Sequence, residues 1–66
     1  MDVRNLQWWE REKLLTDKDR DAIEKARYSR WEDIDVNSAE TEAGKYEIEY
    51  IISRKRHTAE WLAGML

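Results

Sequence analysis

Three aspartates at alternate positions form the first group in the sequence whose spacing could do chemistry. Asp17, Asp19 and Asp21 have the spacing that opens a calcium-binding EF-hand loop. That loop also needs glycine at its sixth position and a glutamate at its twelfth, where this chain has Ala22 and Tyr28. Because half of the ligand set is missing, we predict no metal here, and we interpret the three aspartates as the solvated first turn of a helix.

The remaining polar residues form no pattern that indicates catalysis. Nucleophilic catalysis pairs a Ser or Cys with an oriented base, but the spacing of the three serines singles out no partner for His57, the one histidine. The carboxylate pairs Asp33/Asp35 and Glu47/Glu49 have the alternating spacing of the solvated face of a strand. General acid–base catalysis needs one desolvated carboxylate, which a solvated face does not provide. Cysteine and glycine-rich phosphate loops are absent. We therefore expect a protein that is not an enzyme and that binds no cofactor and no metal.

A basic run near the C-terminus is the candidate for a nucleic-acid contact. Residues 50–66 carry three basic and one acidic side chain, a net charge of +2, whereas residues 32–49 carry seven acidic and one basic, a net charge of −6. Nucleic-acid-binding domains usually have a pI above about 9, but the pI of this chain is about 5.1. Nucleic-acid binding is therefore the weaker alternative, and its residues would be Arg54, Lys55, Arg56 and His57.

The adjacent pair Trp8-Trp9 is the strongest sign of a binding surface. Neighbouring side chains point about 100° apart on a helix, so the two rings cannot share one face. Trp9 is in line with Val3 and Leu6 and is expected in the core, whereas Trp8 is expected at the surface. Exposed aromatic residues with nearby arginines have the composition of interface hot spots. We predict a protein-binding surface made of Trp8, Leu15, Arg4 and Arg11.

The first two elements that position these residues are predicted to be helices. Residues 2–15 form the first helix, with apolar side chains on two sides. Thr16 and Asp19 have the spacing of a capping box, with Asp in place of Glu or Gln, which predicts a second helix from there to about residue 30. Ile23 and Ala26 share one side of this second helix and should face the core.

Residues 31–53 allow two interpretations, of which we expect a β-hairpin. A three-residue loop at 42–44, with Gly44 in the left-handed position, would pair Thr41 with Lys45 and sort apolar from polar side chains on both strands. Thr58 would then cap a short final helix at residues 59–66. The predicted fold is a single α+β domain over residues 1–66, in the order α-α-β-β-α.

The alternative is an all-α protein with a long C-terminal helix. Residues 37–40, Asn-Ser-Ala-Glu, could form a capping box that starts a helix of ~28 residues, or ~42 Å. Two objections count against it, because such a helix is longer than a compact globule of this size and it places Gly44 in its interior. In this alternative the protein has three helices, and its long helix pairs with that of a second copy.

Size and composition limit how the domain can be supported. Sixty-six residues without cysteine have neither disulfides nor thiolate metal sites, so self-association or a tightly packed Trp-rich core must support the fold. With 41% charged residues and a net charge of −3, we expect a soluble homo-oligomer. There is no apolar run of the ~18 residues that span a membrane, and residues 1–13 lack the apolar region of a signal peptide. We expect an intracellular, cytoplasmic protein with no membrane contact.

These observations together predict a binding protein. The expected function is a small protein-interaction module that binds and modulates a larger protein partner as an inhibitor or adaptor. Compact accessory proteins of this kind are common in phages and mobile elements. The alternatives are a nucleic-acid-binding regulator that uses the basic run and a structural subunit of a larger assembly.

Overall fold

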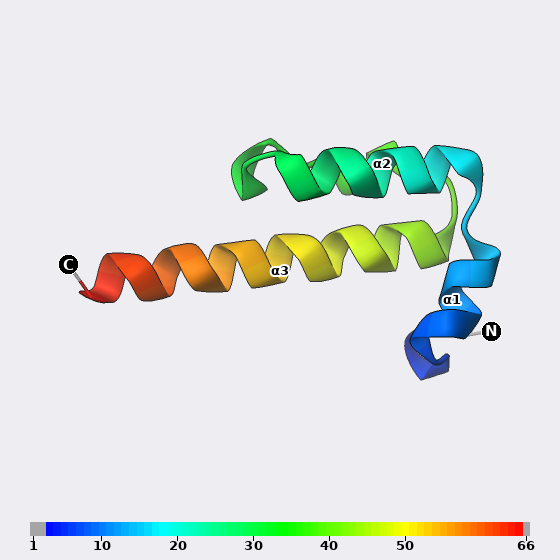
Figure 1. Ribbon diagram of the computed structural model, residues 1–66, viewed down its shortest axis with the longest axis horizontal. Coiled ribbons are helices and arrows are strands. Elements are labelled where there is room, and N and C mark those ends of the chain that lie inside the picture. The colour runs from blue at the N-terminus through cyan, green and yellow to red at the C-terminus, as the bar shows by residue number, and fades with distance from the viewer. Residues whose placement is uncertain (1–2, 66) are drawn as a thin grey trace.

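The chain is a three-helix protein in its computed structural model, which describes residues 3–65 and their side chains as far as residue 64 (Figure 1). Single turns of 3-10 helix occur at η1 (Val3–Asn5), η2 (Trp31–Asp33) and η3 (Val36–Ser38). The α-helices are α1 (Trp8–Leu14), α2 (Asp17–Tyr28) and α3 (Glu42–Met65). No strand occurs between residues 3 and 65. The α+β prediction is therefore wrong, and the structure fits the all-α alternative.

Helices α2 and α3 lie side by side and run in the same direction (Figure 1). Hydrogen bonds join Asp19 in the first turn of α2 to the residues just before α3. At the other end, Lys55 of α3 donates to carbonyls in the last turn of α2 and just after it. Because the helices are parallel, the chain must return along the pair between them, and η2 and η3 lie on this return and pack against α3.

The first strand of the predicted hairpin is replaced by the return segment with η3, and its loop and second strand are replaced by the first three turns of α3. Thr41 is the N-cap of the helix. Its hydroxyl accepts a hydrogen bond from the backbone N of Gly44 at 3.1 Å, and its carbonyl accepts from Lys45 N at 3.0 Å. Buried or half-buried apolar residues then follow at helical spacing: Ala43, Ile48, Ile51 and Ile52. The alternation that favoured strands depended on the two tyrosines, which lie at half-buried and exposed positions of the helix. Thr58 lies inside α3 and caps nothing.

Both objections to a long helix have physical answers. The helix is indeed longer than the rest of the domain, so the molecule is elongated, with extents of 41 × 22 × 16 Å. Gly44 lies in the first turn of α3, where a Cβ atom would stand 2.4 Å from an oxygen of Asp19. The glycine is needed for this close approach. The helix also begins at Glu42, after the predicted capping box at 37–40, because Asn37 and Ser38 belong to η3.

The predicted first helix is broken in two, and its start at residue 2 lies outside the described residues. Leu6 and Gln7 separate η1 from α1, which begins without a side-chain cap. The capping box of α2 is confirmed: Asp19 N donates to Thr16 Oγ1 at 3.1 Å, and Thr16 N donates to Asp19 Oδ2 at 3.2 Å. The start of α1 is therefore not fixed by a local cap, whereas the start of α2 is fixed by the capping box of Thr16 and Asp19.

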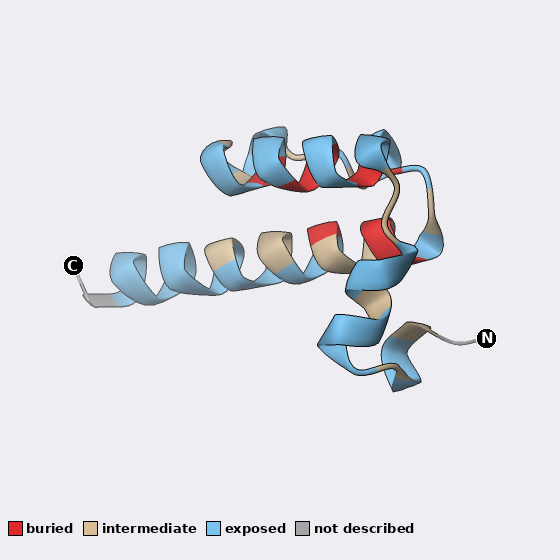
Figure 2. Cartoon of the chain, turned by 45° about the vertical axis from the view of Figure 1, so that its right-hand side comes forward, coloured by how far each residue is buried: buried red, intermediate tan, exposed pale blue. Residues whose placement is uncertain are grey.

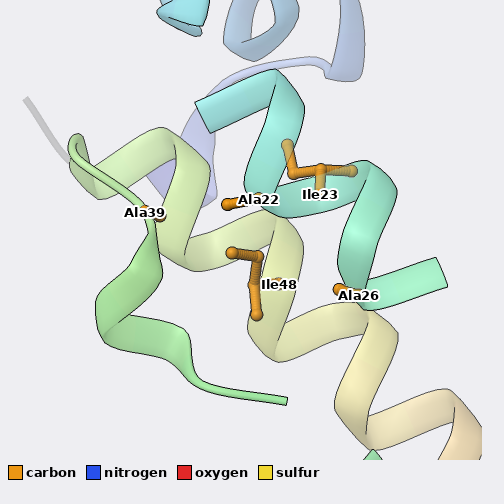
Figure 3. Close-up of a cluster of buried hydrophobic side chains, with 5 residues drawn as sticks. All are labelled: Ala22, Ile23, Ala26, Ala39 and Ile48. Carbon is orange, nitrogen blue, oxygen red and sulfur yellow. The ribbon is translucent and has the colours of Figure 1, made fainter. Parts of the chain in front are cut away.

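The core is built from small side chains rather than from tryptophan (Figures 2 and 3). Among the described residues, the buried apolar ones are Ala22, Ile23, Ala26, Ala39, Ala43 and Ile48. Alanines let α2 and α3 approach closely but remove little apolar surface from water. None of the four tryptophans and three tyrosines is buried, so a Trp-rich core, one of the two supports that we considered, is not present. Trp9 was predicted to be buried, but it is 47% exposed because α1 lies at the edge of the α2–α3 pair.

Candidate functional site

The three aspartates of the incomplete calcium motif lie in different surroundings. Asp17 and Asp21 are exposed, but the Asp19 side chain is fully buried, which corrects the prediction of a solvated turn. The Asp19 carboxylate accepts hydrogen bonds from the backbone N of Thr16 at 3.2 Å, of Glu40 at 2.6 Å and of Thr41 at 3.1 Å, and also from the Thr41 hydroxyl. Donors of the protein itself therefore surround this carboxylate.

The surroundings of Asp19 hold it in its charged form. Burial by itself raises the pKa of the carboxyl group, but the hydrogen bonds from Thr41, Glu40 and Thr16 outweigh burial and lower the pKa to about 2. The carboxylate also lies in the first turn of α2 and beside the start of α3, where two helix dipoles favour negative charge. Asp19 is thus a structural anchor for both helices. Within residues 3–64, no group of three or more His, Asp or Glu side chains could hold a metal ion.

The predicted nucleic-acid-binding run 54–57 does not form one continuous basic face. Lys55 turns inward, where its Nζ donates to the carbonyls of Ala26 at 2.8 Å, Arg27 at 2.6 Å and Ser29 at 2.7 Å, and so caps the C-terminal end of α2. Of the three exposed members of the run, Arg54 and His57 are one turn apart on α3, whereas Arg56 points to another side of the helix. Arg54 donates to the hydroxyl of Tyr50, and Arg56 pairs with Glu60 at 3.1 Å. His57 lines a shallow hollow of about 530 Å³ between α3 and η3.

The solvated strand face that we expected for the carboxylate pairs Asp33/Asp35 and Glu47/Glu49 does not exist, because no strand occurs between residues 3 and 65. Asp33 and Asp35 lie on the return segment, in and next to 3-10 turns. Glu47 and Glu49 lie on different sides of α3: Glu47 is half-buried and pairs with Arg11, whereas Glu49 is exposed. A helix separates acidic residues that a strand would have aligned.

Two of the predicted protein-binding residues stabilise the domain. Arg11 donates through Nε to Glu47 at 3.0 Å and through Nη1 to the carbonyls of Val3 at 3.3 Å and Leu6 at 2.5 Å. Its guanidinium also lies 4.6 Å from the ring centre of Tyr46. Arg11 therefore attaches η1 and α1 to α3, and only 13% of its side chain is exposed. Leu15, which we expected at the surface, is half-buried and packs against the core.

A groove of about 480 Å³ lies where α1, α2 and α3 meet, and we call it the aromatic groove. Its floor is apolar because it includes buried Ile23 and half-buried Leu15. Two largely exposed aromatic residues line it, Trp8 at 65% and Tyr28 at 85% exposure. The full lining comprises Trp8, Glu12, Leu15, Arg20, Ile23, Glu24, Arg27, Tyr28 and Glu47. The groove thus combines an apolar floor, aromatic walls and charges of both signs.

Trp8 and Trp9 form one exposed aromatic unit, but only Trp8 lines the groove. Their ring centres are 6.0 Å apart and the planes are nearly perpendicular, at 89°, which is the edge-to-face arrangement that aromatic pairs favour. Trp9 is not part of the groove lining, so a ligand bound in the groove would contact Trp8 and not Trp9. Arg4, the remaining predicted residue, is exposed in η1 and is not part of the groove lining.

Two of the predicted protein-binding residues, Trp8 and Leu15, line the groove, but none of its α2 residues was predicted. Arg20, Glu24, Arg27 and Tyr28 follow one another at intervals that place them on one face of α2, so the helical pattern could have grouped them. Nothing in the pattern indicates that this face meets Trp8, because the contact depends on how the chain turns between Leu14 and Asp17.

Comparisons with known proteins give no family for the chain. No protein-family model, no curated protein and no solved structure matches it. Across the described residues, no helix has both the length and the apolar composition needed to cross a membrane.

Proposed function

We propose that this chain is a protein-interaction module that binds a helical segment of a larger protein in the aromatic groove. The observation that carries the proposal is the placement of Trp8 and Tyr28, which are mostly exposed, beside a groove with Leu15 and Ile23 in its floor. Aromatic side chains around a pocket are the usual centre of binding energy in protein interfaces. The module is proposed to act in the cytoplasm, as an inhibitor or adaptor without catalytic activity.

The lining of the groove indicates the chemistry of the partner. A helix laid into an apolar groove contributes residues about one turn apart, and a groove of about 480 Å³ has room for large side chains from successive turns. Glu12 and Glu24 are exposed at its edge, and the structure gives neither of them an ion pair with another described residue. We therefore propose that the partner segment is an amphipathic helix with an aromatic or leucine residue and flanking basic side chains.

Affinity capture with matched variants tests the proposal. Wild type, Trp8→Ala and Tyr28→Ala would be used as bait in lysate of the native host, with Trp9→Ala as the control outside the groove lining. We expect one protein to be captured by wild type and Trp9→Ala but depleted about tenfold or more with each groove variant, because both variants remove an aromatic anchor. Equal recovery with all four baits would refute the groove as the binding site.

Nucleic-acid binding remains the second candidate, with weaker support. Its basis is that Arg54, Arg56 and His57 are exposed on α3, whereas Lys55 is occupied by the carbonyls of α2. Salt-dependent retention on DNA or RNA, lost in the Arg54→Ala, Arg56→Ala double variant, would favour it over the protein partner.

A further inference from the structure

The C-terminal part of α3 extends beyond the body of the domain, and we call residues 56–64 the α3 tail (Figures 1 and 2). Lys55 is the last α3 residue that hydrogen-bonds to the α2 end of the molecule. Every residue of the tail is exposed, including Trp61 at 58% and Leu62 at 52%. Ala59 and Ala63 lie on the same side of the helix as Leu62, and Trp61 points about 100° away from Leu62. A helix whose apolar residues meet only water is the pattern of a surface that is covered in a complex.

The surface area of the whole chain leads to the same conclusion. The chain exposes 5364 Å², whereas a folded monomer of 8.0 kDa exposes about 4,500 Å². The excess of roughly 900 Å² is close to the about 800 Å² that each partner buries in a protein interface of standard size. The radius of gyration, 12.8 Å, likewise exceeds the about 11 Å expected of a compact chain of this length. The monomer therefore exposes an excess of surface about equal to the area that one partner buries in an interface of standard size.

The tail has the chemistry that the aromatic groove selects. It is an amphipathic helix with Trp61 and Leu62, and Arg56 and His57 are exposed at its start. Arg56 pairs with Glu60 one turn away, but both side chains are more than 60% exposed, so this pair is weak and exchangeable. Glu12 and Glu24 at the groove can form ion pairs with Arg56, and Arg20 and Arg27 can form ion pairs with Glu60. The charges of the tail and of the groove are complementary in both signs.

We infer that the aromatic groove of one copy binds the α3 tail of a second copy, and that the exchange is reciprocal. A two-fold axis would place the two α3 helices antiparallel, with each tail against the groove of the other copy. Tail-to-tail pairing is the simpler alternative, but it would bury little besides Trp61 and Leu62 on each copy. Reciprocal exchange covers both surplus surfaces of each chain. This inference rests on the proposed function, because the tail uses the same groove and a partner helix would have to displace it.

Complementation between two defective variants tests this arrangement. Trp61→Ala removes the anchor of the tail, and Trp8→Ala removes one wall of the groove, so each variant alone loses both contacts of the dimer. An equimolar mixture keeps one intact contact, between the tail of the Trp8→Ala chain and the groove of the Trp61→Ala chain. Sedimentation equilibrium should show a wild-type dimer and, for each variant alone, self-association weakened about tenfold or more. The mixture should recover a heterodimer of intermediate affinity.

Controls separate this inference from misfolding and from the proposed function. Trp9→Ala should dimerise like wild type, and circular dichroism should show unchanged helix content in all variants, because the replaced side chains are exposed. Tyr28→Ala serves as a second groove variant if Trp8→Ala loses helix. A wild type that stays monomeric at every attainable concentration overturns the inference but leaves partner capture untouched. A dimer that is sensitive to Trp61→Ala but not to the groove variants also overturns it and indicates tail-to-tail pairing.

Discussion

The two ends of α3 are held in opposite ways. At its start, Asp19 satisfies the backbone N–H groups of Glu40 and Thr41, and Gly44 admits the carboxylate at close range. At its other end, the tail carries Trp61 and Leu62 into solvent with no neighbouring element to cover them. The comparison teaches that this small domain fixes its fold with a core of small apolar side chains and with polar side chains that bind the backbone of neighbouring elements. Its large apolar side chains are left for contacts with other molecules.

Removing the Asp19 carboxylate should have the largest effect on the anchored end. Asp19→Ala leaves the partly buried N–H groups of Thr16, Glu40 and Thr41 without their acceptor, which we expect to cost about 4 kcal/mol of unfolding free energy. That is most of what a core of this size supplies, so circular dichroism should show loss of most helix. Asp21→Ala is the matched control, because Asp21 is exposed and pairs only with Lys25 at the surface. If both variants unfold at the same urea concentration, Asp19 is not the anchor.

Replacing each glycine by alanine should change the unfolding free energy in opposite directions at the two ends of α3. Alanine in place of glycine usually stabilises a helix by up to about 1 kcal/mol, and Gly64→Ala should do so weakly, because nothing lies within 4 Å of the new Cβ. Gly44→Ala should destabilise the domain by about 3 kcal/mol, because its Cβ would stand 2.4 Å from Asp19. Urea midpoints of the two variants measure this difference. A stabilised Gly44→Ala protein would show that the carboxylate can move away without loss.

Acid should weaken the anchored end in a defined pH range. The pKa of Asp19 is lowered from 3.8 to about 2 on folding, so the stability it contributes is complete above the unfolded value and is lost as the pH falls toward 2. The lost free energy is about 2 kcal/mol. NMR titration of the Asp19 carboxyl carbon should give a midpoint well below 3.8, the usual pKa of an aspartate. A midpoint near 4 would contradict the hydrogen-bonded charge.

Lys55 marks the point where anchoring ends, and its removal should have the smallest of these effects. Lys55→Met takes the donor away from three carbonyls at the end of α2, two of which are partly buried. Water can replace part of this contact, so we expect a loss of about 1 kcal/mol. Arg54→Met, at an exposed position, should change the unfolding free energy by less than about 0.5 kcal/mol. Equal effects of the two variants would mean that Lys55 does not hold α2 to α3.

Local patterns predicted the second helix well because its signals are local. Thr16 and Asp19 form their capping box within four residues, and Ile23 and Ala26 face the core as their spacing indicates. The hairpin prediction was wrong because residues 43–52 fit both a two-residue and a helical period, and the deciding contact comes from Asp19, far away in the sequence. The same contact explains Gly44, which looked like a turn residue until its close neighbour was known.

The candidate site could be predicted only in part, for a similar reason. Adjacent tryptophans identified Trp8 as a surface residue, and its exposure agrees with this. Trp9 was assigned to the core because a helix needs one apolar face, but α1 is too short and too peripheral to bury it. The sequence pattern also could not show that Arg11 turns toward Glu47 or that Lys55 turns toward α2, since both partners lie on other elements.

The parallel course of α2 and α3 has a consequence for how the protein folds. An antiparallel helical pair can zip together from its loop, but here the start of α3 must meet Asp19 across a separation of 21 or 22 residues. Contacts of this range require a long loop to close, so they are costly to form early in folding. We expect the Asp19 contacts to form after the transition state, so that conservative changes there speed unfolding and hardly alter the folding rate. The unfolding rate, and with it the lifetime of the native state, would then depend on the contacts of one buried carboxylate.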